Sequence, residues 1–354
     1  GAAGAPTLDD VGAARPGVPT GLLLATRVVS FAFFARQLAV ACANPGGMDL
    51  PLRYLDGSAF PALGVGRVTP GSSKPVQRLG GAARFALFTV QTWALQTLYF
   101  GLAALATSAR LLYDVWVDAP PRASAGAASA HMLPPSTTVL RLTHVLFEIA
   151  WAASHLVTTV TTYVLVPAAC RATPPGGDPR GLALFHPEQL VFHNANVVFA
   201  NLDAVLSRMR LVASHAPAAA LWCCWFVAFT WVVTAPRLRC VPYFFVDYTL
   251  PLRTALAFHL GLLAVVLAFH EVGVLLGAVL AARGLAARVA AYAAILAAIA
   301  CVRPPTTGTG PPAAAPESTK RNGVGDRTPT TTTNGVRTVV AGELAASAKG
   351  DKLR

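Results

Sequence analysis

The sequence predicts an all-α integral membrane protein, a bundle of six transmembrane helices with a seventh candidate near the carboxyl end. The chain has 354 residues, of which 54% are hydrophobic and 12% are charged, and its mean hydropathy is +0.53. Soluble domains carry about 25% charged residues, so this chain has too little polar material to cover a water-facing surface. Its apolar residues also come in blocks of roughly 20, the length of a bilayer-spanning helix.

The distribution of charge argues against a nucleic-acid-binding protein, and the spacing of the cysteines argues against a metal-binding protein. The formal net charge is +12, but lysine and arginine lie mainly in the predicted connections and the tail. No basic run is interleaved with aromatics, so we expect no nucleic-acid partner. Arginines next to helices instead suit anionic lipid headgroups. The six cysteines form no C-x-x-C pair, and we expect neither a bound metal nor another cofactor.

The first third of the chain contains two predicted spans. Residues 1–19 are rich in Ala, Gly and Pro and are expected to be disordered. The first span covers about 20–43 and contains Arg27 and Arg36. Each arginine costs a few kcal/mol at mid-bilayer unless it reaches the interface or finds a partner. A Gly/Pro-rich loop separates this span from the second, at about 82–108.

The other predicted spans follow at shorter intervals. They cover about 139–168, 187–206, 217–235 and 254–282. Pro187 and Pro217 suit the first turns of the fourth and fifth spans. The Ala-rich segment 285–302 is just long enough to span, or it lies in the interface. Residues 20–302 therefore form the membrane domain, and 303–354 are expected to be a disordered tail.

Several predicted spans carry polar side chains on one face. Thr89, Thr92 and Gln96 share a face of the second span. Others lie in the third span (His144, Glu148, Trp151, His155, Thr158, Thr162), the fourth (His193, Asn194, Asn196, Asn201, Asp203) and the sixth (His259, His270, Glu271). Thr, Asn and Gln can simply join helices, at about 1 kcal/mol for each hydrogen bond. Ionisable groups at membrane depth more often mark a site or a pathway.

Two of these residues are predicted to lie at the same depth. Thr89 follows Arg84 by five residues, and His193 follows Glu188 by five. Even-numbered helices enter from the same side, so both side chains should lie about 7–8 Å inside one boundary. His259 falls at a similar level. A hydroxyl and an imidazole at matched depth could act as a nucleophile and its general base.

The stretch F-T-V-Q-T-W-A-L-Q-T-L-Y-F-G, residues 88–101, resembles the second-span motif of the androgen-induced membrane protein family. That family contains intramembrane hydrolases of fatty acid esters of hydroxy fatty acids. Its motif has a Thr seven residues before a Gln, followed by an apolar-aromatic pair and Gly. The matching residues here are Thr89, Gln96, Tyr99, Phe100 and Gly101.

Further positions extend the resemblance over roughly residues 20–280. The family has a His near the start of the fourth span and an acidic residue ten positions later, matched here by His193 and Asp203. The segment V-P-Y-F-F-V-D-Y-T-L-P, with Pro242 and Phe244, is similar to the family's segment after the fifth span. Ten residues correspond to about 15 Å of helix, so Asp203 is expected to be structural or to lie in a distal part of the pocket.

The resemblance implies a Thr/His intramembrane hydrolase of fatty acid esters of hydroxy fatty acids or similar bilayer-resident esters. Thr89 would be the nucleophile and His193 the general base. Five residues are candidates for oxyanion donors or pocket walls: Gln96, Thr92, Asn194, Asn196 and His259. The partner would be a lipid that enters from the bilayer. The resemblance also implies an endomembrane location, such as the endoplasmic reticulum, or the plasma membrane.

Three alternatives stay open at this point. A metal-dependent lipid hydrolase would draw ligands from His144, Glu148, His155, His193 and His259, although the chain lacks the H-x-x-x-H and H-E-x-x-H pairs of such enzymes. A transporter would use the polar faces to line a path. A structural or regulatory membrane protein would use them only to hold its helices together.

Overall fold

The computed structural model describes residues 6–43, 48–50, 53–54, 77–117, 135–167, 170, 185, 187–238, 240–248 and 250–300. The helices are α1 (Leu8–Gly12), α2 (Thr20–Ala43), α3 (Phe88–Val117), α4 (Thr137–Val160), α6 (Pro187–Leu206), α7 (Ala216–Phe229), α8 (Ala235–Leu238), α9 (Leu252–Val279) and α10 (Leu285–Ile299). Two π-helical segments, η4 (Thr161–Leu165) and η8 (Thr230–Thr234), continue α4 and α7. Short 3₁₀ turns are η2 (Gly81–Ala86), η7 (Ala213–His215) and η9 (Phe244–Val246). The predicted tail 303–354 lies outside the described residues.

Four helical segments are long and apolar enough to cross a membrane: Thr20–Ala43, Thr137–Leu165, Ala213–Leu238 and Leu252–Val279. The helical membrane-protein class is therefore supported, whereas six or seven spans stay a prediction. Helices α3 and α6 are present, but they are not apolar enough to be among these four. Helix α10 has 15 residues, a length of about 22 Å, which is shorter than the hydrocarbon core of about 30 Å.

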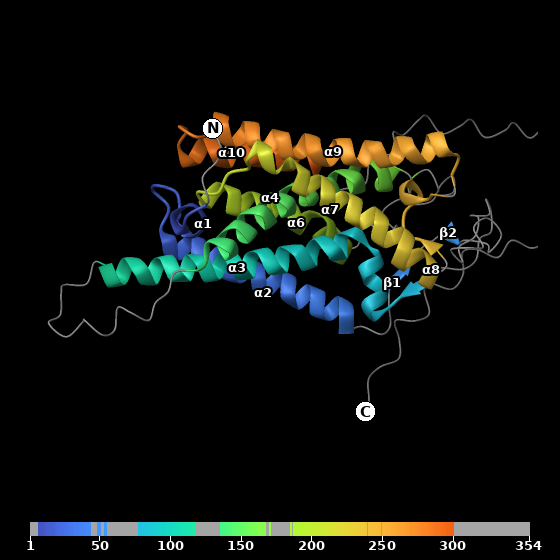
Figure 1. Cartoon of the computed structure of the whole chain (residues 1–354), viewed down its shortest axis with the longest axis horizontal. Coiled ribbons are helices and arrows are strands. Elements are labelled where there is room, and N and C mark those ends of the chain that lie inside the picture. Colours follow the sequence, from blue (N-terminus) through green and yellow to red (C-terminus); the bar gives the residue numbers. More distant parts are fainter. Residues whose placement is uncertain are drawn as a thin grey trace, which may run out of the picture. The chain divides into compact units, whose positions relative to one another are not determined.

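The bundle is built around α4, which is buried along most of its length from Leu146 to Thr158. Helices α3, α6, α7 and α9 pack on it, and α2 packs along α3. Figure 1 shows that α3, α6 and α9 begin at the end of the bundle near α8. Helices α4, α7 and α10 begin at the opposite end, beside α1. The even-numbered predicted spans thus enter from the same end.

The N-terminal segment contradicts the prediction of disorder over its described part, residues 6–19. Helix α1 begins with a capping box in which Thr7 and Asp10 satisfy each other's backbone N–H groups. Val11 is fully buried, and Ala14 forms a β-bridge with Ser207 after α6. These contacts with distant residues order a segment whose composition alone predicts a flexible tail.

Two short antiparallel strand pairs add to the predicted all-α fold. Strand β1 (Met48–Leu50) pairs with β3 (Gln77–Leu79). Strand β2 (Arg53–Tyr54) pairs with β4 (Cys240–Val241). Strand β4 belongs to the connection between α8 and α9 and pairs there with β2 (Figure 1). This connection supplies a residue of the candidate site.

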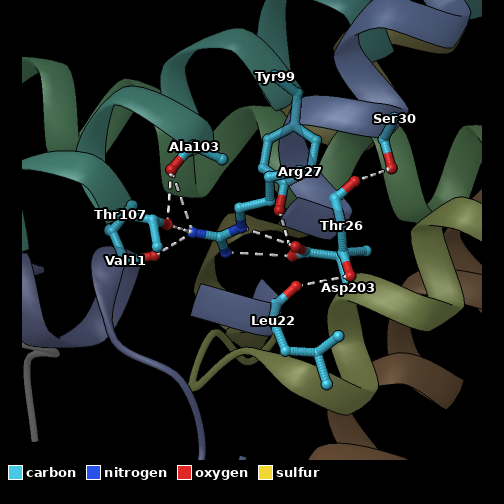
Figure 2. Close-up of polar contacts among 9 residues, drawn as sticks. All are labelled: Val11, Leu22, Thr26, Arg27, Ser30, Tyr99, Ala103, Thr107 and Asp203. Atoms are coloured by element: carbon cyan, nitrogen blue, oxygen red, sulfur yellow. Dashed lines mark hydrogen bonds and ion pairs between the residues drawn. The ribbon is translucent and has the colours of Figure 1, made fainter. Parts of the chain in front are cut away.

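Arg27, which the sequence leaves without an evident partner, forms a buried network toward the α1 end of the bundle (Figure 2). Its Nε lies 2.7 Å from Asp203 Oδ1, and both side chains are fully buried. The Tyr99 hydroxyl donates to Asp203 Oδ2 at 2.5 Å. Arg27 Nη1 donates to the Val11 carbonyl at 2.7 Å and to Thr107 Oγ1 at 2.6 Å. This Arg27 network joins α1, α2, α3 and α6, which gives Asp203 a structural role.

Candidate functional site

Thr89, the predicted nucleophile, is the second residue of α3 and is buried. It lies on the wall of an apolar pocket of about 30 Å³. The other walls come from α4, η4, α7, η9 and α9: Leu156, Val157, Val160, Thr161, Leu165, Cys223, Phe226, Phe245 and Leu262. The π-helical segment η4 widens the helix at Thr161, and π-segments frequently occur at functional sites. The predicted nucleophile thus faces a small apolar space.

Tyr243 is a polar neighbour of Thr89 that sequence reasoning missed. Its hydroxyl is hydrogen-bonded to the Thr89 side chain and to the backbone of Phe88. Burial raises the pKa of Tyr243 to about 12, although these two hydrogen bonds oppose the shift. The phenol therefore keeps its proton at neutral pH and can donate a hydrogen bond. Its only sequence signal was the segment V-P-Y-F-F-V-D-Y-T-L-P after the fifth span.

His193, the predicted base, lies on α6 about one helical turn deeper than Thr89. The rings of Trp93 and Phe192 stack with centroids 3.9 Å apart, which sets the level of α6 against α3. Thr89 precedes Trp93 by four residues, or about 6 Å along the axis. Within the described chain, no hydrogen bond joins Thr89 to His193. The structure therefore places both residues toward the same end of the bundle but does not bring them into direct contact.

A layer of buried polar residues lies between α3, α4 and α6, beginning at the level of His193. Five of its side chains each have a buried polar atom without a hydrogen-bond partner among the described residues. The atoms are Thr92 Oγ1, Trp93 Nε1, Gln96 Oε1, His193 Nδ1 and Asn196 Oδ1, and we call these five residues the polar layer. Buried polar groups are almost always paired with protein or water. The polar layer is therefore a place for water or for polar atoms of a ligand.

The amide orientations in the polar layer differ from the predicted oxyanion role. Gln96 Nε2 donates to Ser154 Oγ at 2.6 Å and to the Asn196 carbonyl at 3.0 Å. Asn196 Nδ2 donates to the Phe192 carbonyl at 3.4 Å. Both amides thus use their donors within the protein and have acceptor oxygens without partners. The donors that remain for a developing oxyanion are the hydroxyls of Thr92 and Tyr243 and the Trp93 indole.

The two other predicted pocket residues lie apart from this arrangement. His259 packs edge-on against Trp231, with ring centroids 5.1 Å apart. It makes no hydrogen bond or ring contact with Thr89 or His193 in the part of the chain that the structure describes. Asn194 is half-buried on α6, and it is not among the residues that line the pocket at Thr89. His259 is therefore turned toward η8, which contains Trp231.

The histidines and Glu148 of the third predicted span hydrogen-bond to other residues of the protein. Glu148 accepts the Val212 N–H at 2.6 Å and hydrogen-bonds to His215 Nδ1 at 2.6 Å. His144 Nε2 donates to the Arg210 carbonyl at 2.7 Å. His155 lies deeper, with Nδ1 donating to its own helix. Across the described ranges, no three His, Cys, Asp or Glu side chains come together as a metal site.

Comparison with known proteins finds no matching family model, no matching curated protein and no matching solved structure. The resemblance to the androgen-induced membrane protein family therefore rests on its motifs in this sequence.

Proposed function

We propose that this protein is an intramembrane hydrolase of lipid esters, with Thr89 as nucleophile and His193 as general base. One observation carries the proposal. The buried Thr89 hydroxyl lies at an apolar pocket beside a phenol donor, and the half-buried His193, whose buried Nδ1 has no partner among the described residues, lies one turn deeper. This arrangement supports the proposal because both residues lie toward the same end of the bundle.

The reaction would proceed through an acyl-threonine intermediate. Thr89 Oγ attacks the ester carbonyl carbon while His193 takes the hydroxyl proton, directly after a side-chain movement or through one bridging water. Tyr243 and Trp93 can donate hydrogen bonds to the oxyanion that forms. The alkoxide leaves with the proton from His193. Water then attacks the acyl-threonine, His193 takes its proton, and the fatty acid and the Thr89 hydroxyl are released.

A bilayer-resident ester suits the walls of this site. The pocket at Thr89 is lined almost entirely by apolar side chains, as an acyl chain requires. Its volume of about 30 Å³ holds little more than one water, so an acyl chain would enter by displacing side chains between α4, α7 and α9. The acceptor oxygens of Gln96 and Asn196 would then position the attacking water or a substrate hydroxyl.

The proposal also requires that α3 and α6 cross the membrane as the second and fourth of six spans. Their outward faces are apolar, as lipid contact requires. Leu98 and Leu105 on α3 are 51% and 67% exposed, and Val198 on α6 is 40% exposed. Gln96 and Asn196, by contrast, are fully buried on the inward faces. This division explains how two less apolar helices can lie in the bilayer.

The test is hydrolysis of a branched fatty acid ester of a hydroxy fatty acid by the full chain purified in detergent. We expect turnover by the wild type and loss of at least about 100-fold in Thr89→Ala and His193→Ala. Thr92 lies one turn deeper on the same face of α3, so Thr92→Ala tests whether its hydroxyl, rather than that of Thr89, is the nucleophile. Thr97→Ala is the matched control, because Thr97 donates only to the Trp93 carbonyl of its own helix.

Two results would contradict the assignment. Full activity in a folded Thr89→Ala protein would remove Thr89 as nucleophile, and loss of activity in Thr92→Ala alone would transfer the role to Thr92. A wild type that releases no fatty acid from any lipid ester would remove the hydrolase proposal altogether. Trapping of an acyl group on the peptide that carries Thr89, read by mass spectrometry, would identify the attacking oxygen directly.

A further inference from the structure

A second cavity, of about 1120 Å³, lies at the end of the bundle opposite Thr89. Four parts of the chain line it: the segment around α1, the start of α4, the link between α6 and α7, and the turn between α9 and α10. Figure 1 shows α1 and the start of α10 together at this end. All four membrane-type helical segments have one terminus here, at Thr20, Thr137, Ala213 and Val279. The cavity therefore lies at the level where the bilayer meets water.

The lining of this cavity is strongly basic. Six arginines contribute to it: Arg15, Arg141, Arg208, Arg210, Arg283 and Arg288. Asp10 is the single acidic residue of the lining, and its carboxylate accepts the backbone N–H and the hydroxyl of Thr7 at 2.8 and 2.7 Å. With the histidines neutral, six positive charges face one negative charge, a balance of +5.

None of the six arginines is paired with a carboxylate within the described ranges. Arg208 Nε donates to the Ala14 carbonyl at 3.0 Å, and Arg288 Nε donates to the Arg283 carbonyl at 3.2 Å. The nearby Glu148 is already engaged with Val212 and His215. Backbone carbonyls satisfy hydrogen bonds but cancel no net charge, so the excess of positive charge in the cavity is uncompensated.

Two of the six arginines are buried in the protein. Arg15 is 9% exposed and Arg288 is 3% exposed, and Arg15 Nε is buried without a hydrogen-bond partner. Burial, followed by the nearby charge of Arg288, lowers the pKa of Arg15 to about 10. Buried charges are costly unless they are paired. A bound anion would pair with both guanidinium groups at once.

We propose that this cavity is a binding site for a phosphorylated polyanion, with Arg15 and Arg288 as its buried anchors. The planar guanidinium fork matches phosphate oxygens in a bidentate geometry. A phosphate monoester carries about −1.5 to −2 charges at neutral pH, so two such groups approach the excess charge of the lining. The exposed Arg141 and Arg283 stand where a second phosphate can be held.

The position of the cavity allows two sources of this chemistry. A phospholipid with additional phosphates on its headgroup would reach the cavity from the bilayer surface. A soluble organic phosphate would reach it from water. Either ligand would make the same contacts with arginine, and the two differ only in whether an acyl chain anchors the phosphates in the membrane.

The experiment uses the full chain in phosphatidylcholine nanodiscs. One arm adds soluble inositol bisphosphate, and the other incorporates phosphatidylinositol bisphosphate in the disc; native mass spectrometry and the shift in unfolding temperature report binding. We expect saturable binding in at least one arm. Binding in both arms identifies the phosphorylated headgroup as sufficient, whereas binding of the lipid alone identifies a membrane ligand.

Variants test whether the arginines of the cavity are responsible. Loss of a charge-assisted hydrogen bond should weaken affinity about tenfold or more, so we expect this in Arg15→Gln. Because buried Arg15 also supports the fold, the exposed double variant Arg141→Gln/Arg283→Gln provides a second test, with at least about fivefold weakening expected. The double variant Arg237→Gln/Arg253→Gln removes two exposed charges outside the cavity lining and should bind as the wild type does.

Three outcomes would overturn the proposal. They are absence of binding in both arms, unchanged affinity in folded Arg15→Gln and in Arg141→Gln/Arg283→Gln, and equal weakening in the Arg237→Gln/Arg253→Gln control. The last would show that general attraction between a basic protein and an anion accounts for the binding. None of these measurements depends on ester hydrolysis, so the site stands or fails independently of the catalytic proposal.

Discussion

Two groups of buried polar residues lie along the interface of α3 and α6, and they differ in how completely they are hydrogen-bonded. In the Arg27 network, the guanidinium and the Asp203 carboxylate pair directly, and Tyr99 and Thr107 satisfy further positions. In the polar layer, nearer the start of both helices, each of the five residues keeps one buried polar atom without a partner among the described residues. The same two helices thus contribute to one hydrogen-bonded network and to one layer whose buried polar atoms lack partners among the described residues.

The comparison separates polar groups that hold the fold from polar groups that are available for chemistry. A buried donor or acceptor without a partner costs about 1–3 kcal/mol, which gives the polar layer a reason to bind water or ligand. Among the described residues, Arg27, Tyr99, Thr107 and Asp203 have no buried polar atom without a partner, and Arg27 and Asp203 carry opposite charges. We therefore expect changes in the network to lower stability, and changes in the polar layer to lower activity.

The largest effect is expected from Asp203→Asn. This change leaves Arg27 charged and fully buried without its counter-charge, which should lower the free energy of unfolding by about 3–5 kcal/mol. Unfolding in detergent, followed by circular dichroism, measures the loss. The paired replacement Arg27→Met/Asp203→Leu removes both charges and should recover most of it. A single variant as stable as the wild type would show that the ion pair does not hold the helices together.

Much of this fold could be predicted from the sequence, because the signals that mark a helix lie within the helix and at its ends. Helices α2 and α6 have the predicted bounds, since their apolar blocks and terminal residues mark both ends. The cost of Arg27 in a membrane span also predicted that it needs a partner. What the sequence could not supply was the partner's identity, because Asp203 lies 176 residues away.

The site was less predictable for the same reason. Thr89 lies in α3 and Tyr243 in the connection after α8, and no periodicity within one helix indicates a contact between them. The directions of the Gln96 and Asn196 amides depend on Ser154 and Phe192. Helical spacing placed these amides on inward faces, but only their neighbours decide whether they offer donors or acceptors.

An intermediate effect is expected from Gln96→Met, which keeps the side-chain length and removes the unpartnered acceptor. We expect kcat/KM for ester hydrolysis to fall roughly tenfold to 100-fold, because the attacking water or substrate hydroxyl loses its acceptor. The free energy of unfolding should change by only about 1 kcal/mol, the value of a typical hydrogen bond. Steady-state kinetics and detergent unfolding measure the two quantities on one preparation. A large loss of stability with unchanged kcat/KM would make the polar layer a second structural network.

The smallest effect concerns Tyr243, whose hydroxyl lies beside Thr89, and it appears as a pH dependence of stability. The folded-state pKa of Tyr243 is raised to about 12 from an ordinary value of 10.0, mainly by burial. Its protonated form is favoured by folding, so its contribution is complete below pH 10 and is lost as pH rises from 10 through 12. The free energy of unfolding should therefore fall by about 1–2 kcal/mol more in the wild type than in Tyr243→Phe over this window. Tyr248, whose pKa burial also raises to about 12, is present in both proteins and cancels in the comparison. Identical pH profiles for the two proteins would show that the Tyr243 hydroxyl is hydrated rather than buried at Thr89, and would remove it as the oxyanion donor.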